Sequence, residues 1–252
     1  MDLRITTVSG DEIQLGEHNY KTTSTQTQKW LPTGLRLIRE VKTDNSCYTV
    51  CHYKGYIYVG QVGGAIDRID QHGRVTKAFI KLDNHVVSLS AHNDRLYTLV
   101  YQDKTPSKVS VHNLNNGQLI KFWNHPFFSY FGQRITQRGN NQLAVGDWPS
   151  KQIIIYTLTG DVIRKVPCPP SLTMTQSVCM SSSGDDSVVI SDYKAGKVVR
   201  MSLKDGSLLW SSDRVTNPGG IVHHPAGYVL VVSNQVDQTT ISVLDEKNGK
   251  TK

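Results

Sequence analysis

The stretch NQLAVGDWPSKQIIIYTLTGDVIRKV, residues 141–166, contains three short apolar runs separated by two turns. Alternating and β-branched residues in each run are typical of β-strands, and Gly160 marks a tight turn between the second and third runs. The same frame of strand, glycine turn and strand recurs at IDQHGRVTKAF, HNLNNGQLIKF and MSLKDGSLLWS. The glycines of the whole series are Gly34, Gly73, Gly117, Gly160, Gly206 and Gly249.

These glycines recur at intervals of 39 to 46 residues, and a second apolar run keeps the same period just upstream of most of them. A period in the low forties built from short strands is the signature of a β-propeller, with one blade per repeat. We therefore predict an all-β, six-bladed β-propeller with four-stranded antiparallel blades, occupying residues 1–252 as a single domain. The predicted blades are approximately 1–45, 46–85, 86–131, 132–174, 175–216 and 217–252.

The first and last repeats are less regular than the four between them. Residues 1–42 supply candidate strands such as Leu3–Val8 and Leu35–Val41, but the stretch 18–28 is polar and weakly patterned. The last repeat stops three residues after Gly249, so its outermost strand is missing. Two interpretations stay open: Leu3–Val8 supplies that strand and closes the ring, or the chain is an excised domain.

The chain is basic, with 28 Lys and Arg against 21 Asp and Glu and a formal net charge of +7. Such an excess favours an acidic partner, such as RNA or an acidic protein surface, and it also suits a simply soluble surface. The N-terminal residues MDLRITTV contain no signal-peptide core, and no run approaches the length of a transmembrane helix. The four cysteines show no close-spaced metal pattern, and Cys47 and Cys51 lie too far apart along one strand to bridge each other. We expect a reduced, cytoplasmic protein without a membrane anchor.

The repeats resemble those of NHL β-propellers, a family named for an Asn-His-Leu motif. The resemblance is carried by NQLAVGDWPSKQIIIYTLTG (141–160) and DSVVISDYKAGKVVRMSLKDG (186–206). Each consists of an aliphatic strand, an acidic residue, a short polar or basic loop and a second strand that ends before glycine. Looser matches are GYIYVGQVGGAIDRIDQHG (55–73) and GYVLVVSNQVDQTTISVLDEKNG (227–249), so the resemblance covers roughly residues 35–249.

The segment CYTVCHYKGYIYVGQVGGAIDRID (47–70), followed by HNDRLYTLV (92–100), is similar to the C-terminal propellers of invertebrate tripartite-motif (TRIM) proteins. This resemblance implies the substrate-recruiting propeller of a ubiquitin ligase. The RING finger, B-boxes and coiled coil would then belong to a longer parent chain, because this sequence contains none of their zinc patterns. The sequence departs from the family at two points. It lacks the literal Asn-His-Leu triplet, and the acidic position of other repeats is occupied by Gln61, Gln102 or Asn234.

Catalytic and metal sites have little support in the sequence. His52, His92 and His224 fall in equivalent turns of three blades, which spread around a rim, whereas zinc needs ligands that converge on one point. We expect these histidines to bond to nearby backbone. Calcium chemistry would need several carboxylates at one mouth of the channel, but strand ends supply only Asp147 and Asp192, which we expect to cap their own loops. We predict no catalytic residue, cofactor or metal, and keep a metal-dependent hydrolase as a third hypothesis.

One loop feature recurs in three successive blades. The segments VYQDKTPSK (100–108), GDWPSKQ (146–152) and SDYKAGK (191–197) each carry an aromatic residue followed by lysine, and repeat geometry places them on one face. Aromatic rings can stack on bases while lysines neutralise phosphates, which suits single-stranded RNA, and the same surface suits an acidic peptide anchored by aromatics. With Arg134 added, the predicted binding residues are Tyr101, Lys104, Lys108, Trp148, Lys151, Tyr193, Lys194, Lys197 and Arg134.

The sequence therefore predicts a non-catalytic, monomeric recognition module that binds a protein partner through this face. RNA binding on the same face is the alternative. A third interpretation is that the loop lysines are only solvated and the aromatics cover blade edges. The aromatic-rich connection NHPFFSYFGQR (124–134) opens on the same face, and we expect Phe127–Phe131 to pack as a wedge between blades.

Overall fold

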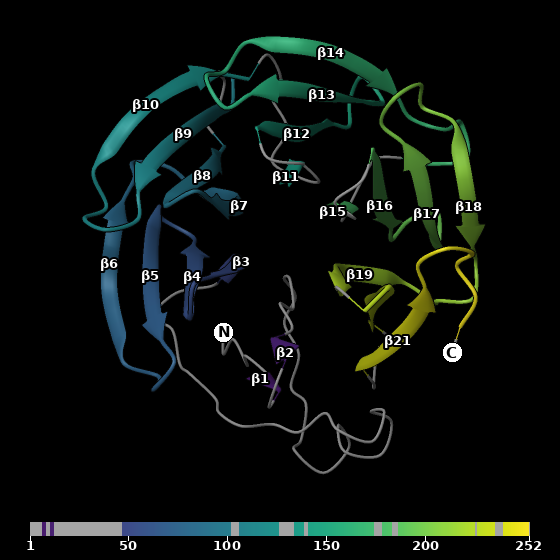
Figure 1. Cartoon of the computed structure of the whole chain (residues 1–252), viewed down its shortest axis with the longest axis horizontal. Helices are drawn as coiled ribbons and strands as arrows, with labels where there is room; N and C mark the ends of the chain where they lie inside the picture. The colour runs from purple at the N-terminus through teal and green to yellow at the C-terminus, as the bar shows by residue number, and fades with distance from the viewer. Residues whose placement is uncertain are drawn as a thin grey trace.

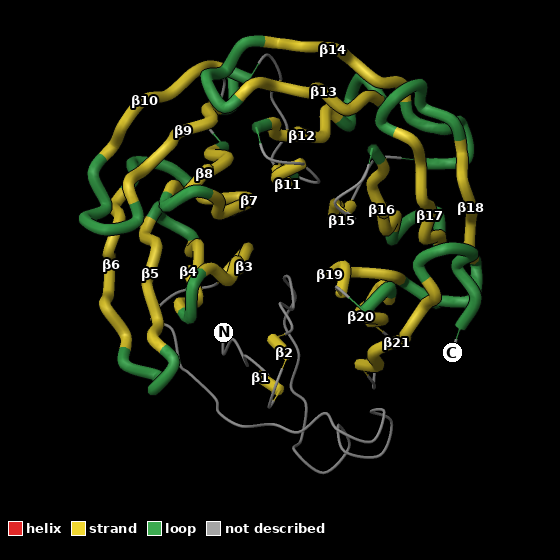
Figure 2. Tube along the Cα trace, in the orientation of Figure 1, coloured by secondary structure: helices red, strands yellow, loops and turns green. Residues whose placement is uncertain are grey.

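The computed structural model describes residues 7–8, 11–12, 47–101, 106–125, 134–138, 141–173, 178–182, 186–224, 226–234 and 239–251. Their longer strands form five antiparallel sheets arranged around a common axis, which confirms the prediction of an all-β propeller (Figure 1). Figure 2 shows strands and loops among the described residues, and no described segment is a helix long and apolar enough to cross a membrane.

Four of the sheets have four strands each, running in chain order from the axis outward (Figure 1). The first contains β3 (Cys47–Tyr53), β4 (Tyr56–Gln61), β5 (Ala65–Asp70) and β6 (Val75–Lys81). The second contains β7 (Val86–His92), β8 (Arg95–Val100), β9 (Lys108–Asn113) and β10 (Leu119–Asn124). The third contains β11 (Ile135–Arg138), β12 (Gln142–Asp147), β13 (Gln152–Thr157) and β14 (Val162–Pro167). The fourth contains β15 (Val178–Ser182), β16 (Ser187–Asp192), β17 (Lys197–Ser202) and β18 (Leu208–Ser212).

The fifth sheet has three strands, β19 (Pro218–His224), β20 (Tyr228–Asn234) and β21 (Thr239–Asp245). We call β3, β7, β11, β15 and β19 the inner strands, because they lie nearest the axis, and β6, β10, β14 and β18 the outer strands (Figure 1). This order places the first strand of each sheet nearest the axis and the last strand on the circumference (Figure 1).

The prediction of six four-stranded blades is wrong, because the described residues form five blades of three or four strands. In the region predicted as the first blade, they form a hairpin in which β1 (Thr7–Val8) pairs with β2 (Asp11–Glu12). The rest of that predicted blade lies outside the described residues. The polar stretch 18–28 lacks the apolar alternation that a strand between two sheets needs, so a glycine period alone overcounted the blades. Closure of the ring by Leu3–Val8 would require this segment to pair with the fifth sheet. Among its described residues, Val8 pairs with Asp11 instead.

The core lies between neighbouring sheets, and β13 shows why its sequence is a nearly continuous apolar run. Ile153 and Ile155 pack in a buried cluster with the fourth sheet, whereas Ile154 and Tyr156 pack in a second cluster with the second sheet. A strand that is buried on both faces needs apolar residues at successive positions and not only at alternate ones. The run 153–156 is therefore determined by the position of its blade between two others.

The turn between the third and fourth strands of a blade contacts the outer strand of the preceding blade. A Cβ atom at Gly160 would lie 2.7 Å from the Trp123 ring, and one at Gly249 would lie 2.6 Å from the Trp210 ring. At Gly117 the corresponding contact is a backbone carbonyl oxygen at 2.6 Å. These glycines also have positive φ angles, between +68° and +96°. The repeated glycine is thus required both by the turn and by the contact between blades.

We expect the Gly160→Ala substitution to lower the free energy of unfolding by about 3 kcal/mol, because it combines a strained φ with a clash against Trp123. The control is Gly196→Ala, since Gly196 has a φ of +61° but no atom within 4 Å of its Cβ position. That variant should lose about 1 kcal/mol. Urea unfolding of both variants measures the difference, and equal losses would show that Trp123 does not constrain the turn.

Candidate functional site

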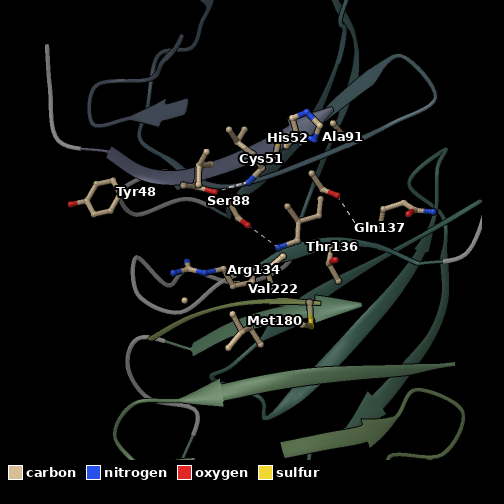
Figure 3. Close-up of a pocket in the computed structure, with 17 residues that line it drawn as sticks. Tyr48, Cys51, His52, Ser88, Ala91, Arg134, Thr136, Gln137, Met180 and Val222 are labelled. Carbon is tan, nitrogen blue, oxygen red and sulfur yellow. Dashed lines mark hydrogen bonds between the residues drawn. The ribbon is translucent and has the colours of Figure 1, made fainter. Parts of the chain in front are cut away.

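The inner strands of all five sheets surround a cavity of about 280 Å³. Side chains from β3, β7 and β11 provide most of its wall, and β15 contributes Met180 (Figure 3). Tyr48 and Arg134 lie toward one end of the cavity, and His52 and Gln137 lie toward the other. The ring therefore encloses a channel whose two ends carry different polar groups.

Hydroxyl groups bond the inner strands to one another across the cavity wall. Thr49 Oγ1 accepts a hydrogen bond from the Leu89 backbone N–H at 3.1 Å. Ser88 Oγ and Ser90 Oγ accept equivalent bonds at 3.1 Å from the backbone of Ile135 and Gln137. An inner strand has no neighbour within its own sheet on its axial side, so its backbone groups need other partners. Short hydroxyl side chains on the preceding blade provide them.

Arg134 immediately precedes β11 and lines this cavity. One of its guanidinium nitrogens, Nη1, donates to the Val87 carbonyl oxygen at 3.3 Å, so the side chain is bonded to the neighbouring inner strand. The sequence predicted a basic residue on the loop side of the propeller at this position. The structure adds that the guanidinium is part of the channel wall.

The other predicted binding residues lie in the connections β8–β9, β12–β13 and β16–β17 or, for Lys108 and Lys197, at the first residue of the strand that follows. These connections leave their sheets at the same end of the ring, because the strands they join are equivalent in each blade. We call this end the loop face. Its exposed residues include Lys151, Tyr193 and Lys194, whereas Lys197 is half-buried. Lys104 lies outside the described residues.

Trp148 differs from the expectation of an exposed aromatic residue, since it is only 2% exposed. The turn that follows β12 folds its indole against Gly146, and the ring belongs to the buried cluster between the third and fourth sheets. Gly146 has no Cβ, so the ring can approach its backbone closely. In the fourth blade, Ser191 takes the place of Gly146 and Tyr193 takes the place of Trp148. Tyr193 remains 36% exposed. A glycine two positions before an aromatic was the sequence signal for burial.

Tyr101 and Lys108 are also more enclosed than a row of free loop side chains would require. Tyr101 is half-buried against the apolar cluster between the second and third sheets. The Lys108 ammonium lies 4.5 Å from the centroid of the Phe122 ring, a cation–π distance. Among the described parts of the three loops, an exposed aromatic–lysine pair is therefore present at Tyr193 and Lys194. The binding role of the predicted residues stays a prediction.

Two acidic residues at the ends of β12 and β16 face inward, as caps of the loop face. Asp192 accepts from the Thr173 backbone N–H at 2.7 Å, from the Thr173 hydroxyl at 2.9 Å and from the Ala195 N–H at 3.0 Å. Asp147 accepts from the Gln152 side-chain amide at 2.7 Å, and its burial raises the pKa of its carboxyl group. Both side chains are fully buried, and the Asp192 bonds confirm its predicted capping role.

Sequence reasoning missed a third buried carboxylate, Asp67 in the middle of β5. Its Oδ2 accepts from the Gln61 amide at 2.5 Å, and its Oδ1 accepts from the Ala78 N–H at 2.7 Å. Ala78 has a positive φ of 46°, so Asp67 stabilises an irregularity in the outer strand β6. An acidic residue within the alternation AIDRID was the available signal.

The turn histidines His52 and His224 bond to nearby backbone, as the sequence predicted. His52 Nε2 accepts from the Gly55 N–H at 3.2 Å, and His224 Nδ1 accepts from the Ala226 N–H at 3.1 Å. Within the described ranges, no three His, Cys, Asp or Glu side chains come together as a metal site would require.

His125 links the second blade to the third beside the loop face. It is fully buried, its backbone N–H donates to the Ser107 carbonyl at 2.7 Å, and its Nδ1 lies 2.9 Å from the Tyr156 hydroxyl. Burial disfavours the charged imidazolium and lowers the pKa of His125 to about 4.

Comparison with known proteins identifies the fold and no family. No protein-family model matches the chain, and no curated protein matches it. The WD40 β-propeller domain of Doa1 is 15% identical, with a TM-score of 0.61 over 84% of this chain and 68% of that one. A chain of the mitotic checkpoint complex is 13% identical, with a TM-score of 0.59 over 84% of this chain and 65% of that one.

Two further solved structures extend the comparison. A protein of unknown function from Bacteroides caccae is 13% identical, with a TM-score of 0.63 over 84% of this chain and 82% of that one. The computationally designed Ika8 protein is 15% identical, with a TM-score of 0.56 over 88% of this chain, which spans 65% of the designed protein. These TM-scores establish a shared fold, which for the Doa1 domain is a β-propeller. Identities this low show nothing beyond the fold, so function has to be argued from the site.

We expect the Asp192→Ala substitution to destabilise the protein by about 3 kcal/mol, because it leaves three partly buried donors of Thr173 and Ala195 without their acceptor. Hydrogen exchange at the Ala195 amide should accelerate more than at amides of the sheet interior. Asp213→Ala is the matched control, since Asp213 is exposed and should change stability by less than about 0.5 kcal/mol. Similar effects of the two substitutions would contradict a capping role for Asp192.

We expect stability to fall as the pH is lowered from about 6.5 to about 4. His125 has a folded-state pKa of about 4 against an ordinary value of 6.5, so the unfolded chain binds the proton first in this window. Between pH 7 and pH 5 this group should cost about 2 kcal/mol of unfolding free energy. His125→Phe keeps a ring but cannot be protonated, so urea unfolding at the two pH values should show a smaller loss. An unchanged loss in that variant would assign the pH dependence to other groups.

Proposed function

We propose that this propeller is a non-catalytic recognition module that binds a protein partner with an acidic surface on its loop face. The observation that carries the proposal is the separation of charge in the loops. Asp147 and Asp192 are fully buried, whereas Lys151 and Lys194 are exposed. The connections β12–β13 and β16–β17 therefore present positive charge outward, and their negative charges are withdrawn into hydrogen bonds.

An exposed aromatic ring accompanies this charge. Tyr193 adjoins Lys194 and is 36% exposed, which suits an anchor for a protein surface. Single-stranded RNA would favour several exposed rings in a row. Trp148 is buried and Tyr101 is half-buried, so the described loops favour a protein partner over RNA.

The further step, to the substrate-recruiting propeller of a TRIM-like ubiquitin ligase, rests on the sequence resemblance over residues 35–249 alone. No protein-family model matches the chain to support it. It stays a hypothesis about a longer parent protein. The WD40 domain of Doa1 has a similar fold. A recognition role is compatible with a TRIM-like propeller and with a WD40-like propeller.

Charge reversal on the loop face tests the proposal. The variant Lys151→Glu/Lys194→Glu/Lys197→Glu should reduce capture of partner protein from cell extract on the immobilised chain by at least tenfold, because it repels an acidic surface. The control variant Lys204→Glu/Lys247→Glu/Lys250→Glu makes the same charge change in exposed turns at the opposite end of the ring, and it should keep normal capture. Quantitative mass spectrometry of the captured proteins provides the measurement.

Two results would count against this function. Equal capture by both charge variants would remove the loop face as the binding surface. Capture that disappears after ribonuclease treatment, with affinity falling steeply as salt is added, would assign the face to RNA.

A further inference from the structure

The wall of the central cavity presents hydrogen-bond donors to whatever occupies it. Thr49, Ser88 and Ser90 line the cavity, and each hydroxyl oxygen accepts a backbone N–H of the next inner strand at 3.1 Å (Figure 3). A hydroxyl group also has one hydrogen of its own to donate. Within the described part of the chain, none of these three hydroxyl hydrogens has an acceptor. The backbone bonds fix the three oxygens, so the wall holds three positioned O–H donors.

The charge of the cavity wall is positive. Among the described residues that line the cavity, Arg134 is the only one with a permanent charge, and none is Asp or Glu. The bond from Arg134 Nη1 to the Val87 carbonyl oxygen holds the guanidinium against β7, the strand that carries Ser88 and Ser90. Arg134 is half-buried, so solvent screens its charge less than it screens an exposed one. The cavity therefore favours an anion over a metal cation or a basic side chain.

Arg134 marks the end of the cavity that lies nearest the loop face. The Gly146 N–H donates to the Arg134 carbonyl oxygen at 2.9 Å, and Gly146 is the last residue but one of β12. The connection β12–β13, which belongs to the loop face, leaves the sheet directly after it. Tyr48 lies toward the same end of the cavity, whereas His52 lies toward the other (Figure 3). A ligand that enters from the loop face therefore meets the guanidinium first.

The size of the cavity and the apolar part of its wall restrict the anion. The volume of about 280 Å³ lies just below the range of roughly 300–1,000 Å³ that is typical of small-molecule sites. Met180, Ile221 and Val222 supply apolar wall, which suits a short aliphatic chain. One guanidinium balances one negative charge, and its planar N–H groups match the two oxygens of a carboxylate. A doubly charged phosphate would keep one charge unbalanced.

We propose that the cavity binds a carboxylate group on a short aliphatic chain, with Arg134 as its ionic partner and the three wall hydroxyls as hydrogen-bond donors. Two sources supply this chemistry. One is a free small organic acid, and the other is an acidic side chain that a partner protein inserts from the loop face. The second source would extend the loop-face interface proposed above, but the carboxylate site itself does not depend on that interface.

An amide NMR titration of the full chain at pH 7 tests the site with two acids, butyrate and the acetylated, amidated tripeptide Ala-Glu-Ala. The amide signals of Leu89, Ile135 and Gln137 should shift and saturate, because these N–H groups bond the hydroxyls that would meet the carboxylate. The neutral probes butyramide and Ala-Gln-Ala should bind at least tenfold more weakly, since they lack the charge. Absence of saturable shifts with both acids, or tighter binding of inorganic phosphate than of either acid, would overturn the proposal.

Arginine variants test whether the guanidinium holds the acid. Arg134→Gln should weaken acid binding at least tenfold, whereas Arg134→Lys keeps the charge and should weaken it by no more than threefold. Arg214→Gln is the matched control, because Arg214 is exposed in the connection β18–β19 and does not line the cavity. It should bind within twofold of the unmodified chain. Equal weakening by Arg134→Gln and Arg214→Gln would assign the binding to general surface charge. The comparison of acid and amide probes needs no variant, so it stands even where a substitution prevents folding.

The relative affinities of the two acids distinguish the sources. Butyrate that binds at least as tightly as the tripeptide indicates a free organic acid, and a tripeptide that binds more tightly indicates an inserted side chain. Equal capture of partner protein by the two lysine charge variants would remove the loop-face interface but would leave these titrations unchanged. The two proposals therefore fail separately.

Discussion

The contact between the outer strand of one blade and the turn glycine of the next constrains the whole ring. A Cβ atom at Gly206 would lie 2.5 Å from the Pro167 carbonyl oxygen, and the same contact recurs at Gly117, Gly160 and Gly249 with carbonyl or aromatic partners. Near the axis, hydroxyl groups of one inner strand bond the backbone of the next. Successive blades are therefore held together at the circumference, and the first three also near the axis, with apolar side chains packed between them.

This arrangement separates the roles of the two ends of the ring. The turns that contain the repeated glycines are packed against neighbouring blades, so their sequences are restricted. The connections of the loop face are restricted instead by buried carboxylates, as Asp192 shows by bonding both its own turn and the connection from the preceding blade. Lysines at the same connections face solvent, so variation there changes the surface charge without disturbing the core.

Much of the strand pattern could be predicted from the sequence because it depends on local chemistry. The strands β12, β13 and β14 lie where the three apolar runs of residues 141–166 placed them, with Gly160 in the turn between the second and the third. The number of blades could not be predicted, since a turn glycine marks a hairpin and does not show that four strands stack into a blade. For the loop face, spacing identified Tyr193 and Lys194 as exposed neighbours, but it did not show that Trp148 folds back over Gly146.

The sequence by itself determined the all-β class, the position of the turns and the lengths of most strands, because alternation, β-branched residues and glycine act within a few residues of each other. Only the tertiary structure decided that five blades surround the axis, that Arg134 lines the cavity and that Asp67 is buried within its sheet. The position of Arg134 depends on contacts with the neighbouring blade, between residues 47 apart in the sequence. The burial of Asp67 depends on Gln61 and Ala78 of its own blade, which its carboxylate bonds. Local pattern therefore specified the strands, and packing between blades specified which side chains remain available for binding.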